Sequence, residues 1–230
     1  DLHSFPTRRS SDLDDNACNI FKKNFGIIPD NRDIREVKSD DIPEFDILTG
    51  GFPCQSFSIV AQNPKRLGVK DERGKLFFEM CRILKEKQPK CFIAENVKGI
   101  LTANKKSAFP LILKEFEDSG YDVQYRILNS ANYGVPQKRE RVIIVGFRSD
   151  LNIKFDFPEN IINDESKFEP LEKVVEKSVD EKYFFSQRAV EGMLRRRESM
   201  NKGRAQDLSK PCNTVGAHLA KVSLNSTDPV

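Results

Sequence analysis

The 230-residue sequence predicts an α/β fold, because helical and strand patterns alternate between residues 14 and 150. Apolar residues follow a helical period in three segments, which are Asp14–Phe25, Gly74–Lys87 and Ser107–Ser119. Short apolar runs predict buried strands at Phe45–Leu48, Lys90–Ala94, Tyr121–Leu128 and Arg141–Phe147. Such alternation implies crossover connections, and therefore a mainly parallel sheet with helices on both faces.

The elements follow one another in a simple order. In the first helix the apolar side chains are Ala17, Ile20, Phe21 and Phe25. Asp33 and Ile34 are then expected in a short polar segment at the end of a strand. The strand at Phe45–Leu48 leads into Gly50-Gly51 and a loop rich in Gly, Pro, Ser and Gln that reaches Asn63. The second helix carries one apolar face, and Gly120 provides a stop after the third.

The two ends of the chain differ from this pattern. Residues 1–13, DLHSFPTRRSSDL, resemble the translation of a short-read sequencing adapter, and we interpret them as an artefact outside the fold. Residues 151–230 are polar, weakly periodic and segregated in charge, as in a small second lobe or an irregular insertion. Lys182–Lys221 carries nine basic and three acidic residues, whereas Asp156–Glu181 carries nine acidic residues and three lysines. This split indicates either a phosphate-binding face or an ordinary solvated surface.

Bulk composition excludes several classes of protein. The net charge of +3 is too small to identify a nucleic-acid partner by itself. The odd number of cysteines, without a close pair, indicates reduced thiols in a cytoplasmic protein, and two histidines argue against a metal site. No apolar run approaches the roughly 20 residues that a membrane span requires. We therefore expect no metal and no membrane partner.

Three segments place polar or reactive groups beside the expected carboxyl ends of strands, where open α/β sheets bind ligands: Gly50–Ser58, Glu95–Val97 and Gln137–Arg141. Cys54 follows Pro53 in a loop, and is either an exposed nucleophilic thiol or the small buried apolar residue that most cysteines are. The other four cysteines, Cys18, Cys81, Cys91 and Cys212, are expected to be buried. Glu95 is either a partly desolvated proton donor or a surface carboxylate. Arg139 and Arg141, two apart on a strand, share a face and could hold a carbonyl or phosphate group.

Together these segments carry a resemblance that none carries alone. They resemble the ordered motifs of the DNA cytosine-5 methyltransferases, in the segments GGFPCQSFS (50–58), DERGKLFF (71–78), FIAENV (92–97) and NYGVPQKRERVIIVGF (132–147). The resemblance covers about residues 14–150. It implies a Rossmann-like methyltransferase sheet, truncated, in 14–150, and part of a small target-recognition domain in 151–230.

The resemblance also implies a chemistry. Cys54 would attack carbon 6 of a flipped-out cytosine, Glu95 would bind or protonate ring nitrogen 3, and Arg141 with Arg139 would orient the base carbonyl and the active-site loop. Asn96 would support the end of the Glu95 strand. Gln55 and Ser58 are implied to lie in a loop that closes on DNA. In the basic stretch, Arg195, Arg196 and Arg197 either contact phosphates or guanine edges or form a solvated helix face. The implied partner is duplex DNA, bound by a monomer in a bacterial restriction–modification system.

The implied cofactor is S-adenosylmethionine. Asp33 and Ile34 match the positions that meet its adenine, and Gly51, Pro53 and Leu76 match positions that line the same pocket. The first strand, the glycine-rich cofactor loop and the last two motifs of the family are not found in the sequence. We therefore expect the parent protein to be active and the 230-residue chain alone to be inactive. A tRNA cytosine-5 methyltransferase of the same fold and a non-catalytic DNA-binding relic stay open as alternatives.

Overall fold

The structure is a computed structural model, and it describes residues 12, 14–52, 75–194 and 206–215. The chain divides into two compact units, residues 1–125 with 143–154 and residues 126–142 with 155–230. None of the helices in these described ranges is long and apolar enough to cross a membrane.

The first helix, α1 (Asp15–Phe25), lies where the sequence predicts it. The Asp14 carboxylate accepts a hydrogen bond from the backbone N–H of Ala17 and caps the amino end. Gly26 ends the helix with a φ of +69°, a left-handed conformation that glycine adopts without strain. A polar segment follows, with a turn at residues 34–36 and a 3-10 turn at Ser39–Asp41. The strand end expected at Asp33 and Ile34 is therefore wrong, because both residues belong to this turn.

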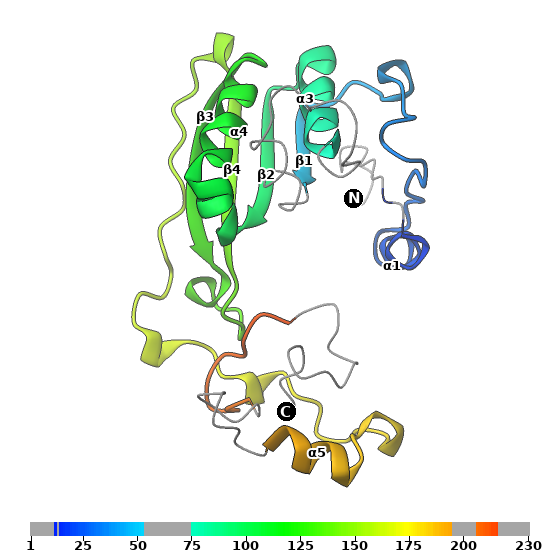
Figure 1. Ribbon diagram of the computed structural model, residues 1–230, viewed down its shortest axis with the longest axis vertical. Helices are drawn as coiled ribbons and strands as arrows, with labels where there is room; N and C mark the ends of the chain where they lie inside the picture. The colour runs from blue at the N-terminus through cyan, green and yellow to red at the C-terminus, as the bar shows by residue number, and fades with distance from the viewer. Residues whose placement is uncertain (1–11, 13, 53–74, 195–205, 216–230) are drawn as a thin grey trace, which may run out of the picture. The chain divides into compact units, whose positions relative to one another are not determined.

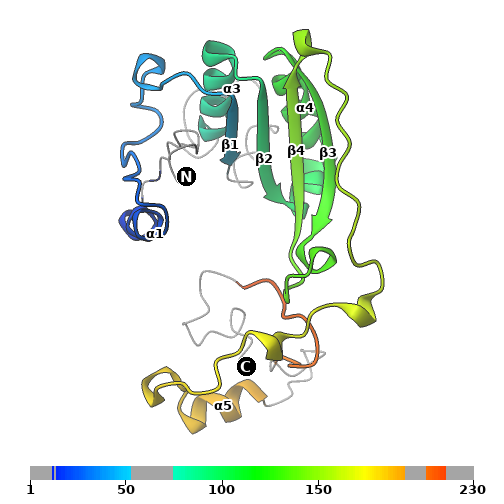
Figure 2. The same ribbon diagram turned by 180° about the vertical axis from the view of Figure 1, so that it is seen from behind.

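The sheet has four strands in the order β1-β2-β4-β3 (Figure 1). Strands β1 (Ile47–Gly51) and β2 (Cys91–Val97) are parallel, with Ile47 opposite Cys91 and Gly51 opposite Glu95. Helix α3 (Lys75–Lys87) connects them, and helix α4 (Ala108–Glu117) connects β2 to β3 (Tyr121–Asn129). Both crossovers step in the same direction across the sheet. Right-handed connections of this kind place α3 and α4 on the same face, as Figures 1 and 2 show.

Two points of this layer differ from the sequence analysis. It expected helices on both faces, whereas the two crossover helices among the described residues, α3 and α4, share one face. It expected a mainly parallel sheet, and the sheet is mixed, because β4 (Glu140–Arg148) runs antiparallel to β3. Hydrogen bonds join the Ser130 N–H to the Arg139 carbonyl and the Ser149 N–H to the Gly120 carbonyl, which is an antiparallel pattern. The connection between the two strands is too short for a crossover, so β4 has to turn back beside β3.

Aromatic side chains fill the core between the sheet and the two helices. Phe92 on β2 is fully buried, and its ring centroid lies 4.4 Å from that of Phe116 and 5.3 Å from that of Tyr121. The ring also lies directly over Gly146 on β4, where an added Cβ would come within 2.1 Å of it. Glycine is therefore required at residue 146 to make room for the Phe92 ring.

The second unit contains little regular structure. It has four short 3-10 turns and one helix, α5 (Gln187–Leu194), among its described residues. Its buried apolar side chains include Phe157, Phe168, Leu171 and Cys212. The N–H of Leu171 donates to the carbonyl of Lys210, and the N–H of Glu172 donates to the carbonyl of Leu208, so two segments distant in sequence lie side by side.

Candidate active site

The carboxyl ends of β1 and β2 form the first part of the candidate site. Because the two strands are parallel, Gly51 lies directly opposite Glu95. A Cβ at Gly51 would lie 3.6 Å from the Glu95 carboxylate, so the glycine leaves the space beside this carboxylate open. The sequence analysis placed Glu95 after the strand, but β2 continues to Val97. Pairing with Gly51 extends the ladder through these polar residues.

Asn96 fixes the chain just before the expected nucleophile. Its side chain is 3% exposed, and its Nδ2 donates to the Phe52 carbonyl at 2.9 Å. Its Oδ1 accepts from the backbone N–H of Val97 at 2.9 Å. Both polar ends of this buried amide are therefore satisfied. Phe52 is itself buried and stands two residues before Cys54, so the end of β2 holds the start of the Cys54 loop.

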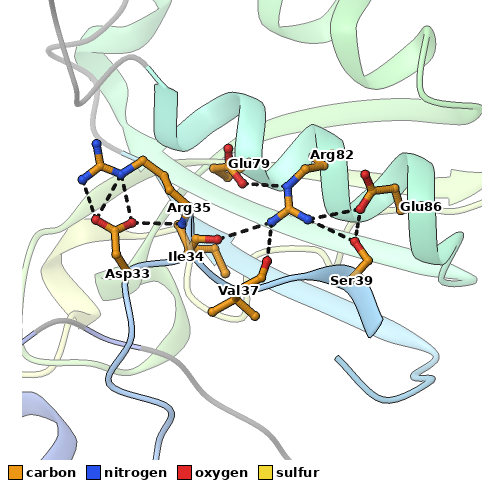
Figure 3. A network of polar contacts seen from close by, with 8 residues as sticks. All are labelled: Asp33, Ile34, Arg35, Val37, Ser39, Glu79, Arg82 and Glu86. Carbon is orange, nitrogen blue, oxygen red and sulfur yellow. Dashed lines mark hydrogen bonds and ion pairs between the residues drawn. The ribbon is translucent and has the colours of Figure 1, made fainter. Parts of the chain in front are cut away.

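The segment with the two expected adenine-binding residues has a defined turn geometry (Figure 3). The Asp33 carboxylate accepts hydrogen bonds from the backbone N–H of Arg35 and from its guanidinium. These bonds lower the pKa of Asp33 from 3.8 to about 2, so the carboxylate stays ionised. Arg82 of α3 donates to the Ile34 carbonyl at 3.3 Å and to the Val37 carbonyl at 2.9 Å.

The remaining expected residues of this unit divide into two groups. Leu76 lies in the first turn of α3 and is partly buried. Pro53, Cys54, Gln55 and Ser58 lie outside the described residues, and so do Arg195, Arg196 and Arg197 of the second unit.

Arg139 and Arg141 belong to the second unit. The backbone N–H of Arg139 donates to the Asn129 side chain at 3.1 Å, and its carbonyl accepts from Ser130. Arg141 lies in β4, partly buried, and its guanidinium donates to the carbonyl of Glu140 at 2.8 Å. The hairpin connection thus holds the main chain at Arg139 in place.

A segment from the carboxyl-terminal part of the chain also holds this connection. Cys212 exchanges backbone hydrogen bonds with Pro136 and Lys138, and forms an isolated bridge with Gln137. The hydroxyl of Thr214 donates to the Lys138 carbonyl at 2.9 Å. Sequence reasoning missed this clamp, which we define as residues 212–214 on residues 136–138. It predicted only that Cys212 is buried, which is confirmed.

Sequence reasoning also missed Arg82, since its charge in a charged helix carries no distinctive signal.

Three other cysteines of the described residues differ in environment. Cys81 and Cys91 are buried, as expected, and burial raises the pKa of Cys81 to about 12. Cys18 is only partly buried, although the sequence analysis assigned it to the buried set.

Together, the fold and the site define an α/β protein with polar groups at the carboxyl ends of parallel strands. Comparison of the fold with solved structures agrees with a methyltransferase. The structure of the S. pombe Dnmt2 methyltransferase aligns with a TM-score of 0.64 and 19% identity, over 83% of this chain and 59% of that one. At this identity the likeness concerns the fold alone.

Sequence comparisons identify the family. The model of the C-5 cytosine-specific DNA methylases matches residues 3–222. The type II methyltransferase M.NgoFVII of Neisseria gonorrhoeae is 47% identical over 150 residues, which are 64% of this chain and 39% of that protein. M.NgoBI of the same organism is 45% identical over 179 residues, 77% of this chain and 53% of its own length. The chain belongs to the C-5 cytosine-specific DNA methylase family, and spans about half the length of these relatives.

Proposed function

We propose that the protein containing this chain methylates carbon 5 of cytosine in duplex DNA, as part of a restriction–modification system. In this proposal Cys54 is the nucleophile, and Glu95 binds or protonates ring nitrogen 3 of the cytosine. The observation that carries the proposal is the bond from buried Asn96 to the Phe52 carbonyl. It ties the chain two residues before Cys54 to the strand that carries Glu95. Family membership and the type II relatives support the substrate class.

The residues present fit S-adenosylmethionine as the methyl donor. The exocyclic amine of adenine needs an acceptor, and the ionised Asp33 carboxylate is one. Ile34 and Leu76 supply apolar surface for the ring, and Gly51 and Pro53 complete the proposed pocket. When bound, this cofactor supplies an electrophilic methyl group.

The chain's own residues carry the remaining chemistry in this proposal. The Cys54 thiolate adds to carbon 6 of the cytosine ring, which pushes electron density toward carbon 5. Glu95 hydrogen-bonds or protonates ring nitrogen 3, so negative charge does not build up on the ring. After carbon 5 is methylated, loss of its proton restores the double bond and expels Cys54. Arg139 and Arg141 orient the carbonyl of the base and the active-site loop.

DNA contacts are proposed for both parts of the chain. Gln55 and Ser58 follow Cys54 in the loop that would close on the base, and Asn96 supports this loop from β2. Arg195, Arg196 and Arg197 lie in the basic stretch Lys182–Lys221, whose charge suits a phosphate backbone. A uniform loss of affinity in Arg196→Ala would indicate phosphate contact, and a loss of discrimination would indicate base contact.

The test uses the product of the complete open reading frame. Transfer of a labelled methyl group is measured on mixed-sequence duplex DNA and on tRNA in parallel. We expect methylation of duplex DNA, none with Cys54→Ser, and a loss of about 10²- to 10⁴-fold with Glu95→Gln. Cys18→Ser serves as the thiol control and keeps the rate. Methylation of tRNA alone would replace DNA as the substrate, and binding without methylation of either would indicate a relic.

A covalent intermediate can be tested independently. In duplex DNA that contains 5-fluorocytosine, fluorine replaces the proton that must leave carbon 5, so the adduct with Cys54 should persist. We expect a denaturation-resistant protein–DNA complex that requires S-adenosylmethionine and is lost in Cys54→Ser. A complex that forms equally with Cys54→Ser would overturn the assignment of the nucleophile.

A further inference from the structure

Arg82 of helix α3 lies at the centre of a network of polar contacts (Figure 3). Its Nη2 donates to the carbonyls of Ile34 and Val37, at 3.3 and 2.9 Å. Its Nη1 donates to the Ser39 hydroxyl at 3.0 Å. One side chain thus holds three residues of the segment 34–39. The described residues 34–39 belong to no strand of the sheet.

Two carboxylates of the same helix orient the guanidinium. Nε lies 2.7 Å from Glu79, three residues before Arg82, and Nη1 lies 3.1 Å from Glu86, four residues after it. Ion pairs at this level of exposure add little stability by themselves. Their effect is to restrict the rotamer of Arg82, so that its fork of donors faces the carbonyls of the segment.

The held segment is the one that carries the proposed adenine contacts. Ile34 is an Arg82 partner, and Asp33 precedes it. The backbone N–H of Val37 returns to the Ile34 carbonyl at 3.3 Å, and Val37 is buried, so the turn is anchored from both of its sides. A binding turn that is fixed before the ligand arrives costs less conformational entropy on binding.

We infer that Arg82 is a positioning residue for the cofactor. It presents the Asp33–Ile34 turn in the geometry that binds the adenosyl group, and it touches neither cofactor nor substrate itself. The inference rests on the proposed function, because that proposal assigns Asp33 and Ile34 to the adenine. A lysine could not replace Arg82, since one ammonium nitrogen cannot occupy the three positions from which Nε bonds Glu79, Nη1 bonds Ser39 and Nη2 bonds the two carbonyls.

The experiment measures binding of S-adenosylhomocysteine by titration calorimetry, using the product of the complete open reading frame. We expect Arg82→Lys to weaken this binding about 10- to 100-fold, with the affinity for duplex DNA unchanged. The matched control is Arg148→Lys. Arg148 also donates to a backbone carbonyl, that of Gln88 at 2.6 Å, and pairs with Asp150, at a similar side-chain exposure (29% against 27%). Neither of these partners belongs to residues 33–39, so its replacement should leave nucleoside affinity unchanged.

Two further readouts separate positioning from folding. Amide hydrogen exchange at residues 33–39 should accelerate in Arg82→Lys, while exchange in α3 stays the same. Glu86→Gln, which leaves both carbonyl bonds, should reduce affinity less than threefold. Equal losses of affinity in Arg82→Lys and Arg148→Lys would overturn the inference, and so would unchanged affinity in Arg82→Lys. If the unsubstituted protein bound no S-adenosylhomocysteine, the proposed function would fail instead.

Discussion

Replacement of Asn96 by alanine tests the link between β2 and the Cys54 loop. The substitution leaves the buried Phe52 carbonyl without its donor, and an unsatisfied buried carbonyl costs about 1–3 kcal/mol. It also removes the acceptor of the Val97 N–H, and because Val97 is 38% exposed, water can replace that bond at a cost of about 0.5–1 kcal/mol. The free energy of unfolding should therefore fall by about 1.5–4 kcal/mol.

Urea unfolding, followed by circular dichroism, measures this loss. With a slope of about 2–3 kcal/mol/M, the midpoint should fall by about 1 M. Asn24→Ala is the control, because the Asn24 side chain bonds to the Ile20 carbonyl on exposed α1, and alanine favours a helix. Its midpoint should stay within the error. Asn96→Asp should be no more stable than Asn96→Ala, since a carboxylate cannot donate to Phe52. A midpoint for Asn96→Ala equal to that of the unsubstituted protein would refute the reasoning.

Three further predictions concern other parts of the first unit. Gly146→Ala should lower stability by about 1–3 kcal/mol, because its Cβ would overlap the buried Phe92 ring; thermal unfolding measures this, and an unchanged melting temperature contradicts it. Cys81 should resist alkylation at pH 8 until the protein is unfolded, because burial raises its pKa to about 12; rapid labelling of the native protein, seen by mass spectrometry, would show otherwise. Hydrogen bonds from Arg35 lower the pKa of Asp33 to about 2. The stability that these bonds give the folded protein is therefore complete above pH 4 and lost as the pH falls toward 2. Asp33→Asn should flatten that part of the acid-unfolding profile, and a profile identical to that of the unsubstituted protein would exclude the Asp33–Arg35 pair as a source of acid sensitivity.

The sequence predicted the helices and strands of the first unit because their apolar periods are strong. Helix α3, for example, ends at Lys87 as expected, and the parallel pairing of β1 and β2 follows from the helix between them. The direction of β4 was missed, although the short connection from Ser130 to Arg139 was visible in the sequence. Alternation alone does not distinguish a crossover from a hairpin, and only the length of the connection does.

The candidate site was predictable only in part. Glu95 and Asn96 stand at a strand end as a sequence pattern, but the bond from Asn96 to the Phe52 carbonyl depends on how two strands pack. Arg82 escaped detection for the same reason, since the two carbonyls that it bonds lie more than forty residues away along the chain. The second unit has no dominant period. Its order depends on backbone bonds between distant segments, such as that from Leu171 to Lys210, which no local pattern encodes.

The pairing of residues 171 and 172 with residues 210 and 208 bears on how the second unit can change in sequence between relatives. Hydrogen bonds from Leu171 to Lys210 and from Glu172 to Leu208 bring together the two ends of the intervening stretch, residues 173–207. The stretch therefore leaves and re-enters the unit at one place. We call residues 173–207 the cassette. Doubling the length of such a closed loop costs only about 0.6 kcal/mol in closure entropy. Insertions, deletions or exchange of this cassette between relatives could change what the basic stretch contacts, while the clamp at residues 136–138 and the sheet stay as they are.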